Sequence, residues 1–438
     1  MELALVGPLR RTLLLAAVLL VAGMPVYFAA KISLAERLSA SSRVEDWERA
    51  AQLEPGNFRP WTRLGWFYHY DIEQFDLRRA VANYQRGLEA NARSVLLRME
   101  LAAAYEAGNE PARAREAYEQ ALRHHPISSE VRWKYGNFLV RQGELTEAFA
   151  EIRRALEWDS SRARLAVSVC WRASGDAERI LKEALPRQQH SYMAALEYFL
   201  ADKNVEASLA AWKYLLALHE PVDVRRVLPL AEELLRRKRF NEARQVWEQA
   251  LVTAGWEQAA APGELVWDGG FERDALNAGF GWRVVPVEGA TTEFDSQVYH
   301  SPARSLRVRF DGTENLDFQH VVQYVLVEPG QRYRFEGYLR TEGLSTDSGI
   351  RFWIHDPHNP AGPNLYTPNV LGTQPWSLEQ ADIVAGPTTR VLAIGLRRLM
   401  SQKINSRIRG TVWVDDVSLR SAPGARAFSG GKQESLTR

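Results

Sequence analysis

The chain has 438 residues, of which 46% are hydrophobic and 25% are charged. This length predicts two or three domains, and the average composition excludes collagen-like, disordered and multi-span membrane proteins. Its 55 Lys and Arg side chains balance 54 Asp and Glu side chains, so we expect no nucleic-acid partner for the whole chain. The single cysteine, Cys170, cannot form an intramolecular disulfide.

An apolar segment lies close to the N-terminus. Residues 12–30 contain no charged side chain, and a helix of this length nearly crosses a hydrocarbon core of roughly 30 Å. Arg10 and Arg11 precede it, so the positive-inside rule predicts a cytoplasmic segment 1–11 and places the bulk of the chain outside the cytoplasm. A cleaved signal peptide is the alternative, but the run is long for one and no small-residue cleavage site follows it. The sequence favours a single-pass anchor in the cell membrane, followed by a linker at 31–43.

Residues 44–255 repeat with a period of 34 residues. The matching positions are Ala114 with Ala148, Tyr118 with Ile152, Ala121 with Ala155, and Leu122 with Leu156. A bulky residue, Leu, a small residue and Tyr in one half, with Ala, an aromatic residue, Ala and Pro in the other, resemble the tetratricopeptide repeat. The resemblance implies a solenoid of about five or six helix pairs, degenerate at 163–220, whose concave groove binds proteins.

Two polar clusters in this region invite other interpretations. The basic run Arg236–Arg239 is interpreted as a solvated turn between two helices, because the chain as a whole is neutral. His124 and His125 are adjacent, and neighbouring helical residues point about 100° apart. They are therefore expected to be exposed histidines at a helix end and not a metal site.

After residue 261 the sequence changes to short runs of β-branched and aromatic residues between turns. The expected strands are Glu264–Trp267, Gly281–Val287, Ser305–Phe310, Asp317–Val327, Arg332–Thr341, Ile350–His355, Trp376–Ile383, Arg390–Leu396 and Thr411–Leu419. They predict an all-β sandwich of the jelly-roll kind over 262–421. Residues 422–438 are rich in Gly, Ser and Lys and are predicted to be a disordered tail.

Five short signatures follow one another in this β region. They are Asp268–Glu272, Gly281-Trp282, His300–Leu306, Val327–Tyr333 and Val414–Leu419. In this order they resemble the galactose-binding-like jelly rolls of cellulose- and xylan-binding carbohydrate-binding modules. The resemblance implies a structural Ca²⁺ at Glu272, Asp415 and Asp416, which match its positions. In the alternative, these carboxylates pair with Arg or cap a turn.

Sugar binding requires exposed aromatic rings, because the C–H faces of pyranoses are apolar. Trp353, Tyr366 and Trp376 are the candidates because they lie outside the signatures, whereas Trp282 and Trp413 are expected in the core. The alternation of a strand does not say which sheet face is open, so core packing stays an alternative for Trp353 and Trp376.

One loop of the β region carries a cluster of side chains suited to metal binding or catalysis. His355, Asp356 and His358 would suit a divalent metal in a hydrolase, and a hydrogen-bonded turn is the alternative. The sequence contains no nucleophile elbow, phosphate-binding glycine loop or HExxH motif. We therefore expect that the protein is not an enzyme.

The sequence as a whole predicts a membrane-anchored binding protein with a helical solenoid and a jelly roll. Its repeats would recruit proteins and its jelly roll would bind carbohydrate, in the synthesis, export or attachment of an envelope polysaccharide. The alternative is a pure assembly scaffold whose jelly roll only caps the last helices. An exposed row of coplanar aromatic rings would favour sugar binding, and tryptophans packed against the helix Asn241–Thr253 would favour the scaffold.

Overall fold

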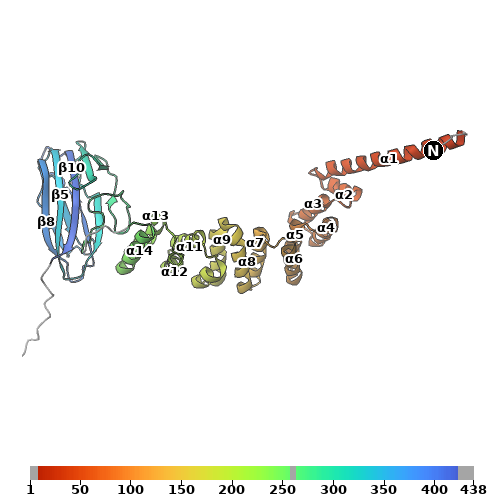
Figure 1. Ribbon diagram of the computed structural model, residues 1–438, viewed down its shortest axis with the longest axis horizontal. Helices are drawn as coiled ribbons and strands as arrows, with labels where there is room; N and C mark the ends of the chain where they lie inside the picture. Colours follow the sequence, from red (N-terminus) through yellow and green to blue (C-terminus); the bar gives the residue numbers. More distant parts are fainter. Residues whose placement is uncertain (1–7, 257–262, 423–438) are drawn as a thin grey trace, which may run out of the picture. The chain divides into compact units, whose positions relative to one another are not determined.

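The computed structural model describes residues 8–256 and 263–422. The chain forms two compact units, residues 1–198 and residues 199–438 (Figure 1). The first unit is helical, and the second joins further helices to a β-sandwich. Residues 1–7 of the predicted cytoplasmic segment lie outside the described residues. Residues 423–438 of the predicted disordered tail lie outside them as well.

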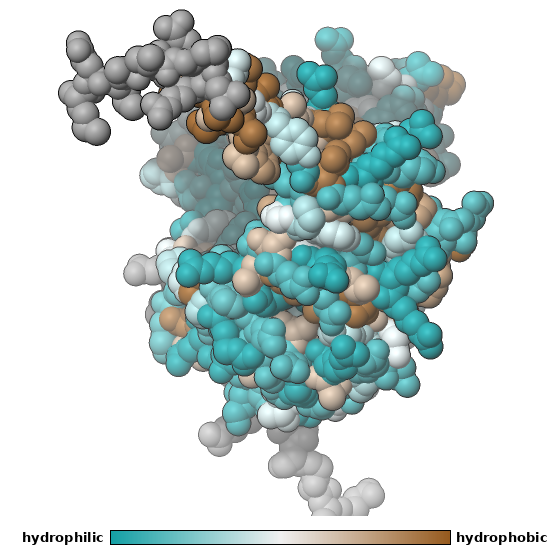
Figure 2. Space-filling view, turned by 90° about the vertical axis from the view of Figure 1, so that its right-hand side faces the viewer, coloured by the Kyte–Doolittle hydropathy of each residue, from teal (hydrophilic) through white to brown (hydrophobic). Residues whose placement is uncertain are grey.

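The first helix, α1 (Pro8–Ser39), contains the apolar segment. From Thr12 to Ser39 it is long and apolar enough to cross a membrane, a property that anchors share with signal sequences. Figure 2 shows hydrophobic residues gathered on this helix, and the apolar side chains between residues 13 and 28 are mostly exposed, Leu19 to 70%. The expected linker differs from the structure, because the helix continues through residues 31–39. Ala35 and Ser39 are buried there and α1 packs against α2 (Val44–Leu53).

The remaining helices of the solenoid follow in close succession. They are α3 (Phe58–Tyr70), α4 (Leu77–Ala90), α5 (Val95–Ala107), α6 (Pro111–His124), α7 (Ser129–Arg141), α8 (Leu145–Trp158), η1 (Ser160–Arg162), α9 (Ala163–Ser174), α10 (Ala177–Arg179), η2 (Ile180–Ala184), α11 (Gln189–Ala201), α12 (Val205–Leu216), α13 (Val224–Arg236) and α14 (Phe240–Thr253). Asn57, Asp76, Ser94 and Ser128 each cap the helix that follows, with a side-chain oxygen that accepts a backbone N–H. These caps set the starts of the repeat helices.

The repeat pattern has a steric cause. A Cβ atom at Gly65 of α3 would lie 2.2 Å from the Tyr84 ring of α4, and one at Gly136 of α7 would lie 2.8 Å from Ile152 of α8. The two helices of a pair therefore approach closely only where one carries a small residue and the other a large one. The basic run at 236–239 lies in the turn between α13 and α14, as expected.

The degenerate region holds four helices in place of one irregular unit. The second of them is short and continues as a π-helix from Ile180 to Ala184, so its residues leave the 3.6-residue spacing of the repeat. The pattern returns on α12, where Trp212 and Leu215 are buried.

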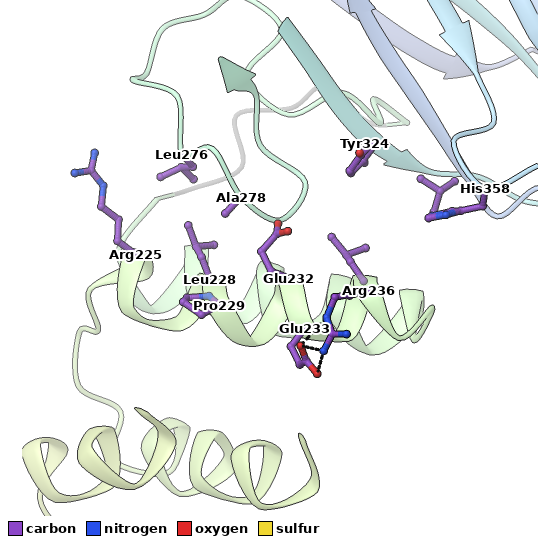
Figure 3. Close-up of a pocket in the computed structure, with 12 residues that line it drawn as sticks. Arg225, Leu228, Pro229, Glu232, Glu233, Arg236, Leu276, Ala278, Tyr324 and His358 are labelled. Carbon is purple, nitrogen blue, oxygen red and sulfur yellow. Dashed lines mark hydrogen bonds and ion pairs between the residues drawn. The ribbon is translucent and has the colours of Figure 1, made fainter. Parts of the chain in front are cut away.

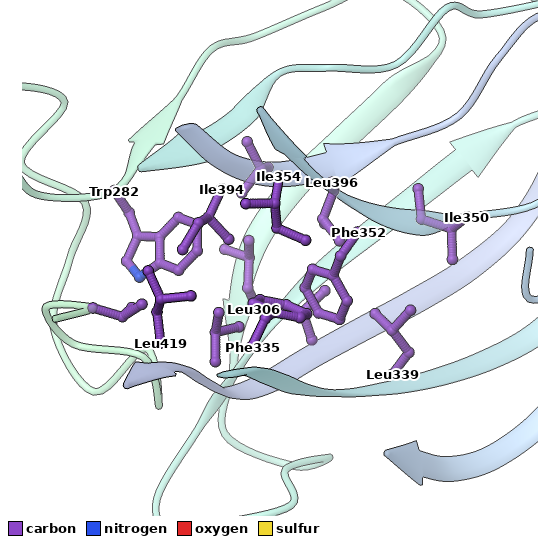
Figure 4. Packing of buried hydrophobic residues seen from close by; sticks show 14 of the residues in the cluster. Trp282, Leu306, Phe335, Leu339, Ile350, Phe352, Ile354, Ile394, Leu396 and Leu419 are labelled. Atoms are coloured by element: carbon purple, nitrogen blue, oxygen red, sulfur yellow. The ribbon is translucent and has the colours of Figure 1, made fainter. Parts of the chain in front are cut away.

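Within residues 263–422 the sandwich consists of ten strands. They are β1 (Arg283–Val284), β2 (Ala290–Asp295), β3 (Ser305–Asp311), β4 (Val321–Leu326), β5 (Arg332–Leu344), β6 (Arg351–His355), β7 (Asn364–Tyr366), β8 (Gly372–Val384), β9 (Val391–Arg397) and β10 (Arg409–Ser421). They form two antiparallel sheets, β1-β4-β9-β6-β7 and β2-β3-β10-β5-β8. Leu306, Phe335, Phe352 and Ile394 pack between the sheets (Figure 4).

Most of the expected strands are present, with four differences. Glu264–Trp267 makes a single bridge, Glu264 to Arg420, and only two residues of Gly281–Val287 form a strand. Two strands, β2 and β7, were not predicted from the sequence. β2 is a polar edge strand and β7 has three residues between prolines, so neither shows the hydrophobic alternation of a half-buried strand.

Candidate functional site

The outer face of the sheet β1-β4-β9-β6-β7 carries a groove. Phe352 and Ile354 of β6 enter the core, so the alternating residues Arg351, Trp353 and His355 point outwards. Strand register aligns one row across the sheet, in the order Arg283, Val322, Gly395, Trp353 and Tyr366. A second row runs through Tyr324, Ala393, His355 and Asn364.

Small residues of β9 form the floor of this groove. Gly395 and Ala393 lie between the larger side chains of β6 on one side and of β4 on the other. The hollow has a volume of about 170 Å³ and is lined by Val322, Tyr324, Trp353, His355 and other residues of the sheet. We call it the sheet groove.

The Trp353 and His355 rings form one wall of the sheet groove, and the Tyr366 ring extends this wall beyond the hollow. The Trp353 ring stacks on the His355 ring at 3.6 Å between centroids and lies 5.8 Å from the Tyr366 ring, within 8° of parallel. The Trp353 indole N–H donates to Asn364 Oδ1 at 2.7 Å, which fixes the ring. The rings are parallel and stacked, so they form a ladder and not the single coplanar row that we expected of a sugar-binding face.

Arginines accompany these rings. The Arg397 guanidinium lies 5.2 Å from the Trp353 ring and forms an ion pair with Asp317 at 2.5 Å. Arg351 lies 5.9 Å from the Tyr366 ring. Burial lowers the pKa of His355, an effect that Asp356 opposes and Arg397 reinforces. His355 is therefore a neutral ring that can both donate and accept a hydrogen bond at neutral pH.

A second and larger hollow, of about 660 Å³, adjoins the sheet at Tyr324, which lines both. Figure 3 shows helix α13 below it, with Leu228 and Glu232 extending toward the loop that holds Ala278. Glu232 accepts hydrogen bonds from the backbone N–H of Gly279 and from Arg283. Since the Arg283 guanidinium lies 4.5 Å from the Tyr324 ring, this contact connects α13 to the side of the sheet groove.

Tryptophans pack the sandwich against α14. The Trp247 ring meets Trp267 edge-on at 5.6 Å and lies 6.3 Å from Phe280. A Cβ atom at Gly279 would lie 2.3 Å from the Trp247 ring, so the loop fits closely around this side chain. This is the packing that the scaffold alternative requires.

The structure separates the predicted sugar-binding residues. Trp353 and Tyr366 are neighbours on the sheet that carries the groove, whereas Trp376 lies on β8 of the other sheet, 5.7 Å from His300. Trp282 and Trp413 are buried, as expected. The other residues of this face, Tyr324, Gly395, Arg351 and Arg397, were not predicted from the sequence. They come together because β9 pairs with both β6 and β4. These strands lie far apart in the sequence, and nothing in the sequence indicates that they pair.

The carboxylates assigned to Ca²⁺ have other partners here. Asp415 accepts the backbone N–H groups of His300 and Ser301 on one oxygen and that of Asp416 on the other. Asp416 contacts the His300 ring at 2.6 Å, and Glu272 accepts from Arg304 N at 3.4 Å. No group of three or more metal-ligating side chains occurs in the described residues. This arrangement fits carboxylates that hold a loop better than a calcium site, and the ion stays a prediction.

The loop after β6 is a hydrogen-bonded turn. Asp356 is buried and accepts the N–H groups of His358 and Asn359 and the hydroxyl of Thr389. His355 stacks on Trp353, and the His358 ring lies 5.4 Å from Phe240. A hydrolase built on these three side chains requires them to converge on one metal position. They do not converge in the structure.

A comparison with known protein families identifies part of the helical region. Residues 99–164 match the family model of the tetratricopeptide repeat. This segment consists of tetratricopeptide repeats. The predicted order of an apolar helix, tetratricopeptide-like helices and an all-β sandwich is thus confirmed. No curated protein matches the chain.

Solved structures resemble each part at low identity. The CBM22-1 xylan-binding domain of Paenibacillus barcinonensis Xyn10C is 16% identical with a TM-score of 0.26, and the match covers 38% of this chain and 100% of that one. A tetratricopeptide repeat protein from Parabacteroides merdae is 18% identical with a TM-score of 0.30, covering 52% of this chain and 93% of that one. YrrB, a tetratricopeptide-repeat protein described as having an unusual peptide-binding site, is 15% identical with a TM-score of 0.26 and covers 49% and 94%.

Proposed function

We propose that this protein is a membrane-anchored adaptor that binds a polysaccharide through the sheet groove and a protein through its helical repeats. Helix α1 would be the anchor, and the rest of the chain would lie outside the cytoplasm. Such an adaptor suits the synthesis, export or attachment of an envelope polysaccharide. Catalysis forms no part of the proposal.

The observation that carries the proposal is the composition of the sheet groove. A carbohydrate site needs apolar rings for the sugar C–H groups and a few fixed polar groups for the hydroxyls. Trp353, His355 and Tyr324 supply the rings around a floor that Gly395 keeps open. The Asn364 amide and the neutral His355 ring supply hydrogen-bonding groups in the adjoining row.

The experiment is a glycan array probed with the full chain in lipid nanodiscs, because a sugar-based detergent would compete for the groove. We expect binding to at least one polysaccharide, weakened about tenfold or more by Trp353→Ala, since the groove loses an apolar ring that lines it. Trp376→Ala is the matched control, because that ring lies on the other sheet and its loss should leave binding unchanged. Binding that responds to Trp376→Ala and ignores Trp353→Ala would refute the proposed location.

A pure scaffold is the second candidate function, and the packing of Trp247 against Trp267 favours it. The contact itself is compatible with sugar binding, since it lies at α14 and the aromatic wall lies on β6 and β7. A folded chain that binds no glycan on the array, yet keeps its protein partners in cross-linking from cells, would leave the scaffold as the function.

A further inference from the structure

Two arginines oppose each other at one end of the sheet groove. Arg351 of β6 and Arg397 of β9 are direct partners in the strand register, and both point outwards beside the aromatic wall. Like charges directly opposite each other on neighbouring strands destabilise a sheet. The pairing therefore calls for a compensating anion.

The described residues supply only one such anion. Asp317 pairs with Arg397, whose side chain is nine-tenths buried. Arg351 makes no ion pair within the described parts of the chain. One positive charge thus remains uncompensated next to Tyr366.

Unsatisfied polar atoms gather at the same place. The described residues contain few buried side-chain nitrogen and oxygen atoms without a hydrogen-bond partner, and three of them are Arg351 Nε, Arg397 Nε and His355 Nδ1. Buried polar atoms in native structures are normally satisfied by protein, water or a ligand. Three such atoms thus belong to residues beside the sheet groove.

We infer that the ligand of the sheet groove is an acidic polysaccharide, whose carboxylate or sulfate group pairs with Arg351 while its sugar ring lies against the Trp353 and Tyr366 wall. A guanidinium forms two parallel hydrogen bonds with either group, so both sources share this chemistry. This inference rests on the proposed function and names the substrate class of the same site.

Two matched pairs of polymers test it with the full chain in nanodiscs. Polygalacturonate is compared with its carboxyl-reduced form, and dextran sulfate is compared with dextran, by affinity electrophoresis. We expect the acidic member of at least one pair to bind about tenfold or more tightly than its neutral form, and salt to weaken that binding. The pair that responds identifies the acidic group.

Variants separate a specific contact from general attraction. Arg351→Gln should remove the preference for the acidic polymer, and Arg351→Lys should keep part of it because the charge remains. Arg340→Gln is the control, since Arg340 lies 5.4 Å from Trp413 on the other sheet and also makes no ion pair with the described residues. It should leave binding unchanged.

Each outcome decides one claim. Equal binding of acidic and neutral polymers, or an acidic preference that survives Arg351→Gln, would overturn the acidic ligand and leave the groove as a carbohydrate site. If no polysaccharide binds to the folded chain, on this panel or on the array, the proposed function itself fails.

Discussion

Asp415 shows how one residue can hold a loop through its carboxylate. It is fully buried in β10 and accepts the backbone N–H groups of His300 and Ser301, which lie more than a hundred residues earlier in the sequence. Burial raises its pKa from 3.8 to about 6, although these amides and that of Asp416 oppose the shift, and the Asp416 charge raises it further. The folded state therefore binds a proton more tightly than the unfolded chain does.

This shift predicts a pH dependence of stability. Because the folded-state pKa is raised, Asp415 contributes most below its unfolded pKa of 3.8, and the contribution is lost as the pH rises toward about 6. At about 1.4 kcal/mol per unit, the loss amounts to about 2 to 3 kcal/mol. Chemical denaturation between pH 4 and pH 7 should show this slope, and Asp415→Asn should flatten it. Parallel pH profiles for the two proteins would show that Asp415 does not titrate in this window.

The types of residue in the sequence predicted which side chains suit a sugar better than they predicted where those side chains lie. The aromatic residues suited to a sugar were found from the sequence, but alternation along β8 gave no sign that Trp376 lies on a different sheet from Trp353. The acidic residues at 272, 415 and 416 were assigned by resemblance. Their present partners are backbone amides and side chains that only the folded loops bring near.

At the scale of the helix, close packing in each repeat depends on a missing side chain. A methyl group at Gly65 would overlap the ring of Tyr84, which is itself completely buried. Gly65→Ala is expected to destabilise the solenoid by about 1 to 3 kcal/mol, because overpacking forces the ring or the helix to move. Thermal unfolding followed by circular dichroism measures the effect.

A second glycine provides the control for this substitution. A Cβ atom at Gly56, in the turn before α3, would meet no atom within 4 Å. Gly56→Ala should therefore leave the unfolding temperature nearly unchanged. Equal effects of the two substitutions would mean that the Gly65 contact does not limit helix packing.

The helices were more predictable than the strands for a physical reason. Each repeat presents the same small and large residues at a period of 34, so one sequence contains several copies of the helical pattern. The strands β2 and β7 each occur once, without a repeated pattern, and few of their side chains are buried. The π-helix at Ile180–Ala184 also escaped the analysis, because a single wide turn changes the spacing without any distinctive residue.

At the scale of the molecule, the unit from residue 199 onward joins the last helices to the sandwich. Trp247 of α14 packs against Trp267 and Phe280, and Trp256 stacks on Trp267 within 11° of parallel. Glu232 of α13 pairs with Arg283 of β1. These contacts predict that the last helix pair and the sandwich unfold together.

Trp247→Ala tests this coupling. Removing a completely buried tryptophan is expected to cost about 3 to 5 kcal/mol and to separate one unfolding transition of this unit into two. Differential scanning calorimetry would resolve them. Trp158→Ala is the control, because Trp158 of α8 is 64% exposed and should be silent. A single transition at a merely lower temperature would show that the coupling between α14 and the sandwich does not depend on Trp247.

The central claim is that the sheet groove is the carbohydrate site, and filling the groove tests it most directly. Val322 points outward from β4 into the hollow, so Val322→Trp would occupy the space above Gly395 without entering the core. We would titrate the full chain in nanodiscs with a polysaccharide that it binds, by isothermal calorimetry. The account predicts that Val322→Trp abolishes the heat of binding while the unfolding temperature is retained. Unchanged affinity in this variant would place the carbohydrate elsewhere on the protein.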